Sequence, residues 1–135
     1  MRVEYDRPPN YDEIARRFKI VGKNVLFAWG DTIYNPMRIK IPPHLKAHEE
    51  MHGWRQRQRN SVEEWWKDYL YNEDFRCQEE VIAHQVEYRT LVRVCPNRAY
   101  RRSALKITAK RLASPLYGRM ITPKFAETLL LQAKP

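Results

Sequence analysis

The stretch HEEMH, residues 48–52, places two histidines four positions apart with a glutamate directly after the first. Four residues make just over one helical turn, so on a helix the side chains of His48 and His52 leave the same face and can hold one metal ion. Hydrolysis at a zinc ion requires neutral imidazole ligands, a third protein ligand and a base that takes a proton from water. The motif supplies two ligands, and Glu49 as the base. The alternative is a solvated helix that carries two histidines, and the third ligand decides between these interpretations.

The segment QEEVIAH, residues 78–84, is the downstream stretch best equipped to supply that third ligand, because it is predicted to be helical and contains carboxylates. Glu80 shares its helix face with Ala83, whose small side chain lets two helices approach closely enough for coordination. Glu79 is rotated from Glu80 by about 100° and would face elsewhere. We therefore predict Glu80 as the third zinc ligand. The alternative is that Glu80 is an exposed helix carboxylate.

Larger stretches around these residues resemble a known class of proteins. HEEMH followed by the downstream EEVIA is similar to the gluzincin pattern, in which one helix gives two histidines and a later helix gives a glutamate in an E-x-x-A setting. Over residues 24–132 the chain resembles the small metallopeptidases encoded by tailed bacteriophages and prophages, through GDTIYNP, LKAHEEMHGWRQRQ, WWKDYLYNEDFRCQEEVIAHQ and ASPLYGRMITPKFAETLL. The resemblance implies the two motif histidines and Glu80 as zinc ligands and Glu49 as the general base. The chain departs from gluzincins at His84, where that family commonly has an acidic or tyrosyl residue.

Supporting roles in such a site stay open at the level of sequence. His84 lies one turn after Glu80, and it either orients a metal ligand through a hydrogen bond or is a surface histidine. Peptide hydrolysis also needs a donor for the developing oxyanion, and Tyr34, His84 and Tyr88 are the candidates. Peptidases of this layout bind substrate as an added strand, so we expect a peptide or protein substrate along the edge formed by residues 32–41.

Two helices must position the metal ligands, and the sequence supports both. A helix over 43–59 carries the HEEMH motif and begins at two prolines, which suit a first turn. A second helix is predicted over 73–94 and ends before Pro96. The remaining helices are predicted from capping residues and apolar spacing after Asn10, from Ser61, over 98–113 and from Thr122.

The sequence also predicts a small β element near the start of the chain. Residues 24–36 contain two β-rich runs separated by Gly30 and Asp31, which indicates a hairpin. Alternating apolar residues over 37–41 predict a third strand or an edge segment. The expected fold class is α+β, mainly α, with a small N-terminal antiparallel β element packed on the motif helix and several helices after it.

The length of 135 residues is typical of one domain. We expect a single compact domain over 1–135, with its core over 24–95 and a C-terminal helical extension over 97–133. No apolar run is long enough to span a membrane, and the first residues lack the apolar stretch of a secretory signal. This pattern favours the cytoplasm of a bacterial host, or the phage particle, over secretion.

Basic residues outnumber acidic residues by 25 to 16, and the resulting net charge of +9 should attract polyanions or acidic partners. Several of these residues form a run that is interpreted either as a solvated face or as a contact with DNA or an acidic protein: Arg98, Arg101, Arg102, Lys106, Lys110 and Arg111.

Three functions from different classes are therefore compatible with the sequence. The first is a zinc peptidase that acts on peptide or protein substrates, including other virion proteins. The second is a structural component of the phage tail or neck, in which the zinc site serves folding or docking with little turnover. The third is a zinc protease that acts on DNA-bound proteins, which the positive charge favours.

Overall fold

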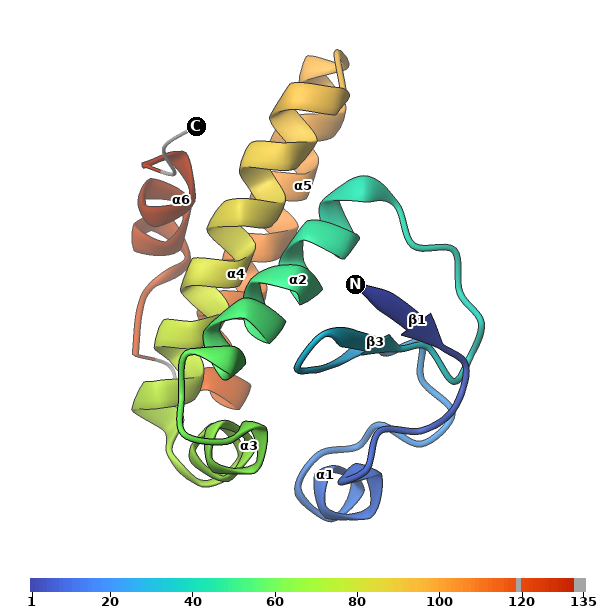
Figure 1. The fold of residues 1–135 in the computed structure, drawn as a ribbon. Coiled ribbons are helices and arrows are strands. Elements are labelled where there is room, and N and C mark those ends of the chain that lie inside the picture. Colours follow the sequence, from blue (N-terminus) through green and yellow to red (C-terminus); the bar gives the residue numbers. More distant parts are fainter. Residues whose placement is uncertain (119, 133–135) are drawn as a thin grey trace.

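The computed structural model describes residues 1–118 and 120–132, and its six α-helices confirm that the fold is α+β and mainly α (Figure 1). A short 3-10 turn, η1, covers Pro115–Tyr117. No helix among the described residues is long and apolar enough to cross a membrane. The helices are α1 Tyr11–Arg17, α2 Pro43–Arg57, α3 Val62–Tyr71, α4 Glu73–Val94, α5 Arg98–Leu112 and α6 Pro123–Leu131.

A three-stranded mixed sheet is found where the sequence predicts an antiparallel element. Its strands are β1 Arg2–Glu4, β2 Phe27–Trp29 and β3 Thr32–Tyr34, in the order β1-β3-β2. Strands β2 and β3 form the predicted antiparallel hairpin, whereas β1 runs parallel to β3. The expectation that residues 32–41 offer a free sheet edge is therefore wrong, because β3 is paired on both sides.

The third strand predicted over residues 37–41 is also wrong, and the side chain of Asn35 explains why. Asn35 is buried, its Nδ2 donates to the carbonyl of Ile39 at 2.8 Å, and its Oδ1 accepts from the N–H of Ile39 at 3.0 Å. A turn closes the same segment, since Arg38 N donates to the Asn35 carbonyl at 3.1 Å. The side chain thus satisfies backbone groups that a strand would have paired with a neighbour.

The hairpin is fixed to α2 by a close backbone approach. A Cβ on Gly53 would collide with the carbonyl oxygen of Gly30, so only glycine fits at this point of α2. The fully buried Gln56 holds β2 and the start of the turn: its Oε1 accepts from Gly30 N at 2.6 Å, and its Nε2 donates to the carbonyl of Ala28 at 3.0 Å. The helix that carries the HEEMH motif is thereby fixed against the sheet.

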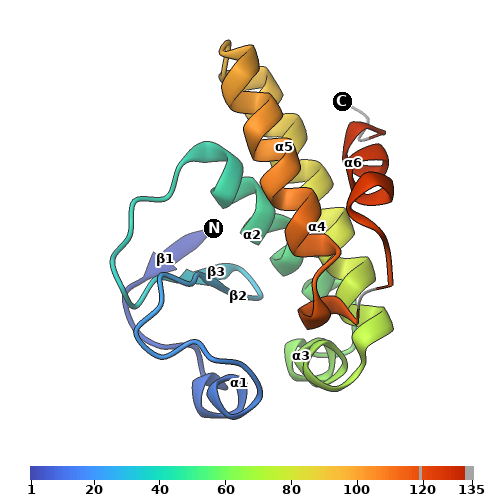
Figure 2. The same cartoon turned by 180° about the vertical axis from the view of Figure 1, so that it is seen from behind.

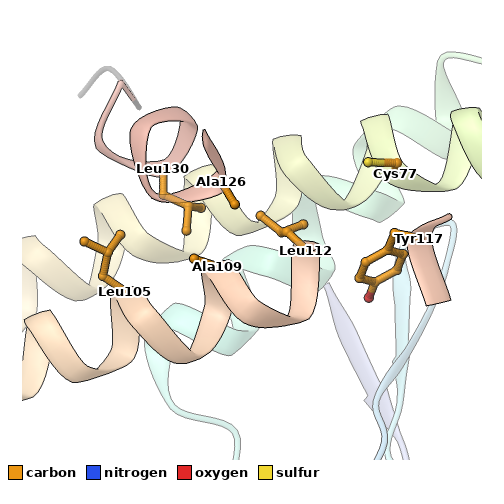
Figure 3. Packing of buried hydrophobic residues seen from close by; sticks show 7 residues of the cluster. All are labelled: Cys77, Leu105, Ala109, Leu112, Tyr117, Ala126 and Leu130. Carbon is orange, nitrogen blue, oxygen red and sulfur yellow. The ribbon is translucent and has the colours of Figure 1, made fainter. Parts of the chain in front are cut away.

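Helix α4 is the central element of the molecule. In both views α2 lies between α4 and the sheet, and α6 lies on the other side of α4 (Figures 1 and 2). Helix α5 packs against α4 and α6, behind α4 in Figure 1 and in front of it in Figure 2. One hydrophobic cluster joins α4 to the C-terminal elements, and Figure 3 shows its buried members Cys77, Leu105, Ala109, Leu112, Tyr117, Ala126 and Leu130. A second cluster fills the space between α1, β2 and α3 with Ile14, Ile20, Phe27, Trp65, Trp66 and Leu70.

Helix boundaries follow the capping signals of the sequence in most places. The Ser61 side chain accepts from Glu64 N and begins α3, and the Thr122 side chain accepts from Phe125 N and begins α6. Asn10 precedes α1 as predicted, but its side chain makes no capping hydrogen bond. The predicted helix over 73–94 is confirmed at both ends as α4.

Candidate metal centre

The packing of α2 on α4 brings the HEEMH motif and Glu80 together. The Nε2 of His52 lies 3.1 Å from the Nε2 of His48 and 3.0 Å from Oε1 of Glu80. The Nε2 of His48 lies 3.4 Å from Oε2 of the same carboxylate. All three side chains are buried. The three residues that the sequence analysis selects as metal ligands thus converge on one point between the two helices.

The spacing of these donor atoms fits a bound metal ion. Two ligands at about 2.0–2.1 Å from a tetrahedral zinc ion lie about 3.3 Å from each other. The measured separations of 3.0–3.4 Å agree with that value. Two imidazole nitrogens 3.1 Å apart can share only one proton, whereas one cation between them and Glu80 interacts favourably with every donor atom.

His84 extends the cluster by one turn along α4. Its Nε2 lies 3.3 Å from Oε2 of Glu80, and the donor atoms of His48, Glu80 and His84 all lie within 4.8 Å of one another. His84 is buried, so it is not the surface histidine that the sequence leaves open. The buried group formed by His48, Glu80 and His84 can hold a metal ion.

Glu87 contacts the outer nitrogens of two of these histidines. Its Oε1 lies 2.8 Å from Nδ1 of His48, as an ion-pair contact and not a well-aligned hydrogen bond, and 3.1 Å from Nδ1 of His84. A carboxylate at this position orients an imidazole ring and makes Nε2 a better ligand. The sequence analysis missed this role, although Glu87 lies seven residues after Glu80 and so shares its helix face.

Tyr69 on α3 contacts Glu80. Its hydroxyl donates to Oε1 of Glu80 at 2.8 Å, and its ring stacks on Trp65 with centroids 5.0 Å apart. Burial, followed by the charge of Glu80, raises the pKa of the Tyr69 hydroxyl well above its usual value, so the group keeps its proton. No local sequence pattern indicates this contact, because it depends on how α3 packs against α4.

The neighbouring residue Glu79 lies on another face of α4, as its rotation from Glu80 predicts. It is buried, accepts from the Trp65 indole N–H at 2.6 Å, and accepts from Arg55 Nε at 2.8 and 3.0 Å. These donors satisfy the carboxylate with protein groups from α2 and α3. Glu79 therefore joins three helices and does not face the histidine cluster.

The cluster lies in the wall of a cleft of about 690 Å³. His48, Glu49, Glu80, His84 and Glu87 line the cleft, and residues 23–27 and Tyr117 also face it. Of the oxyanion donors that the sequence leaves open, His84 lines this cleft, whereas Tyr34 and Tyr88 pack against the two hydrophobic clusters. Tyr69 and Tyr117 are the tyrosines among the described residues of the lining.

The electrostatics of the cleft differ from one carboxylate to the next. Burial raises the pKa of Glu49, and the positive charge of His48 and His52 opposes this rise. Burial would also raise the pKa of Glu80, but its charge and hydrogen-bond interactions with His52 and His48 hold that pKa well below the usual value. Glu80 is therefore charged, as a metal ligand must be, while Glu49 holds a proton more readily than an exposed glutamate.

Comparisons with known proteins give no relatives: no family model, no curated protein and no solved structure matches the chain.

Proposed function

We propose that the chain is a zinc-dependent hydrolase of peptide bonds, with His48, His52 and Glu80 as metal ligands and Glu49 as the general base. The observation that carries this proposal is the convergence of three buried donor groups, 3.0–3.4 Å apart, from two helices, beside a cleft that His48, Glu80 and Glu49 line. A bound zinc ion would polarise the scissile carbonyl and make a water molecule more acidic.

The side chains around the ligands have defined roles in this proposal. Glu49 accepts a proton from water and passes it to the leaving amine, and burial raises the pKa of this carboxyl above its usual value. Tyr69 orients the Glu80 carboxylate through its hydroxyl. Glu87 orients the His48 ring from the opposite side. Tyr117 is buried, lines the cleft and offers a hydroxyl for a developing oxyanion.

The substrate in this proposal is a peptide or protein that enters the cleft from solvent. The resemblance to phage metallopeptidases favours virion or host proteins as natural targets. Strand β3 is paired on both sides and cannot accept an added strand. In this proposal the substrate therefore contacts the segment 23–27 and the walls of the cleft formed by α2 and α4.

A second candidate function is a structural zinc site with little turnover, and the position of His84 favours it. Four protein ligands that fill a tetrahedral sphere are typical of structural zinc, whereas a catalytic site keeps one position for water. The Nε2 of His84 lies 3.3 Å from Oε2 of Glu80, close enough for His84 to be a fourth ligand. In that case the metal would stabilise the packing of α2 on α4, as in a phage tail or neck component.

Hydrolysis of a broad peptide mixture by the zinc-loaded chain, with zinc content measured on the same samples, tests the proposal. Glu49→Gln should keep one zinc per chain and lower turnover by about 100-fold or more, since the amide cannot accept the proton. Equal turnover in the wild type and the variant would contradict the role of Glu49.

His84→Ala separates the two candidates. If His84 is outside the coordination sphere, the variant keeps most of its zinc affinity and its turnover. A wild-type chain that binds one zinc without turnover, together with a His84→Ala variant that binds zinc much more weakly, would favour the structural site.

A further inference from the structure

The excess positive charge of the chain is confined to one segment. Residues 88–126 contain ten Lys and Arg residues and no Asp or Glu, which leaves 15 basic and 16 acidic residues in the rest of the chain. This segment comprises the end of α4, all of α5, η1 and the beginning of α6. The net charge of +9 is thus a local property and is not spread over the surface.

Four of these residues form a regular row on α5. Arg98, Arg102, Lys106 and Lys110 follow one another at intervals of four residues, and all four are exposed. At a rise of 1.5 Å per residue their positions lie about 6 Å apart along the helix and extend over about 18 Å. We call this set the cationic row.

The cationic row destabilises α5, and no ion pair within the described residues offsets this effect. Like charges at i and i+4 destabilise a helix by about 0.2–0.5 kcal/mol per pair, and the row contains three such pairs. Basic residues in the first turn also oppose the helix dipole, and α5 has no acidic residue there. Within residues 1–118 and 120–132, none of the four side chains takes part in an ion pair.

The row begins at the end of α5 that extends furthest from the body. The ends of α4 and α5 that meet near residue 96 project beyond α2, α6 and the sheet in both views (Figures 1 and 2). A partner can therefore approach α5 without contact with the cleft.

We propose that the cationic row binds the phosphate backbone of double-stranded nucleic acid. The duplex presents phosphates at regular short intervals along a stiff rod, and a straight helix with evenly spaced cations matches such a target. Arg and Lys are the side chains that neutralise phosphates, and each contact releases condensed counterions. The proposal concerns backbone contacts and does not depend on the proposed peptidase activity.

Two other polyanionic partners fit the row less well. Membrane binding requires an apolar face on the same helix, but the apolar residues of α5 mostly pack inward, as Leu105, Ala109 and Leu112 do. Single strands are usually bound by aromatic side chains that stack on bases, and Tyr100 is the exposed aromatic residue of α5.

Fluorescence anisotropy with a labelled 30-base-pair duplex of random sequence, measured on the full chain between 50 and 300 mM salt, tests this proposal. The row variant replaces Arg98, Arg102, Lys106 and Lys110 by Gln. The control variant removes the same charge elsewhere, through Gln at the exposed residues Arg16, Lys40, Lys46 and Lys67. Thermal unfolding without DNA checks folding, and the row variant should be at least as stable as the wild type because like-charge repulsion is relieved.

The proposal expects the wild type to bind the duplex with an affinity that falls steeply with salt. The row variant should bind at least about 30-fold more weakly at 100 mM salt, with a salt slope flatter by about 3, and the control variant should lose less than about threefold. An equal loss in both variants, or no binding by the wild type at 50 mM salt, would overturn it. Binding of polyglutamate or of vesicles with anionic lipids that is as tight as duplex binding would also overturn it.

Discussion

Two adjacent carboxylates on α4 have opposite surroundings, although both are buried. Glu79 faces donors that are always protonated, the Trp65 indole and the Arg55 guanidinium, and it needs no further partner. Glu80 has one fixed donor, the Tyr69 hydroxyl, and otherwise faces two histidine nitrogens of α2 at 3.0 and 3.4 Å, groups that donate or accept according to their protonation. The hydrogen bonds of Glu79 are complete within the protein, whereas the group around Glu80 can hold a cation.

The difference shows how to recognise a site among buried charges. Burial alone does not separate the two residues, because each is at most 5% exposed. The chemistry of the partners does: fixed donors indicate a structural contact, and a set of converging acceptor groups indicates a ligand site. Replacing the carboxylate by an amide should therefore change zinc affinity at Glu80 and stability at Glu79.

The largest expected effect is on zinc affinity in Glu80→Gln. Loss of a direct ligand should exceed the 10- to 100-fold effect of losing an orienting group, so we expect a loss of at least about 100-fold. A competition titration against a chromophoric chelator measures it, with Glu79→Gln as the matched control. Equal affinities in the two variants, or a larger loss at Glu79, would show that the third ligand is misassigned.

A smaller effect is expected on stability in Glu79→Gln. The amide of the variant turns an N–H toward Arg55 or Trp65, which are themselves donors. The free energy of unfolding should fall by about 2 kcal/mol, since the Arg55 side chain is 35% exposed and the pair is only partly desolvated. Urea unfolding should show the same decrease in the free energy of unfolding, relative to the wild type, in the presence of zinc and in the presence of a chelator. A loss that appears only with zinc would place Glu79 in the metal site and break the comparison.

The smallest expected effect is that of Glu87→Gln. Glu87 contacts the histidines through Nδ1 and not the metal position, so its amide should weaken zinc binding by about tenfold. The exposed Glu63 provides the control, because Glu63→Gln removes the same charge from α3. If the two variants have the same zinc affinity, Glu87 does not support the ligands.

The features that were predicted correctly from the sequence are those that depend on the spacing of nearby residues. The limits of α4 and the caps at Ser61 and Thr122 follow from residues within one or two helical turns. The different orientation of Glu79 and Glu80 follows from 100° per residue and needs no knowledge of the fold.

Features that depend on distant partners were not predicted. Strand β1 has only three residues, Arg2–Glu4, and forms because it pairs with β3 about thirty residues later. The segment after β3 had the alternation of a strand but is held as a turn by Asn35. In the site, the Tyr69 contact with Glu80 requires the angle between α3 and α4, which no local pattern encodes.

The position of the metal itself tests the central claim most directly. Crystals grown with zinc should give one strong anomalous peak at the zinc absorption edge, within about 2.0–2.2 Å of Nε2 of His48, Nε2 of His52 and one oxygen of Glu80. The distance from the same peak to Nε2 of His84 would show whether the fourth position is open. A site without a peak, or a peak held by Glu79 or by surface residues, would contradict the account.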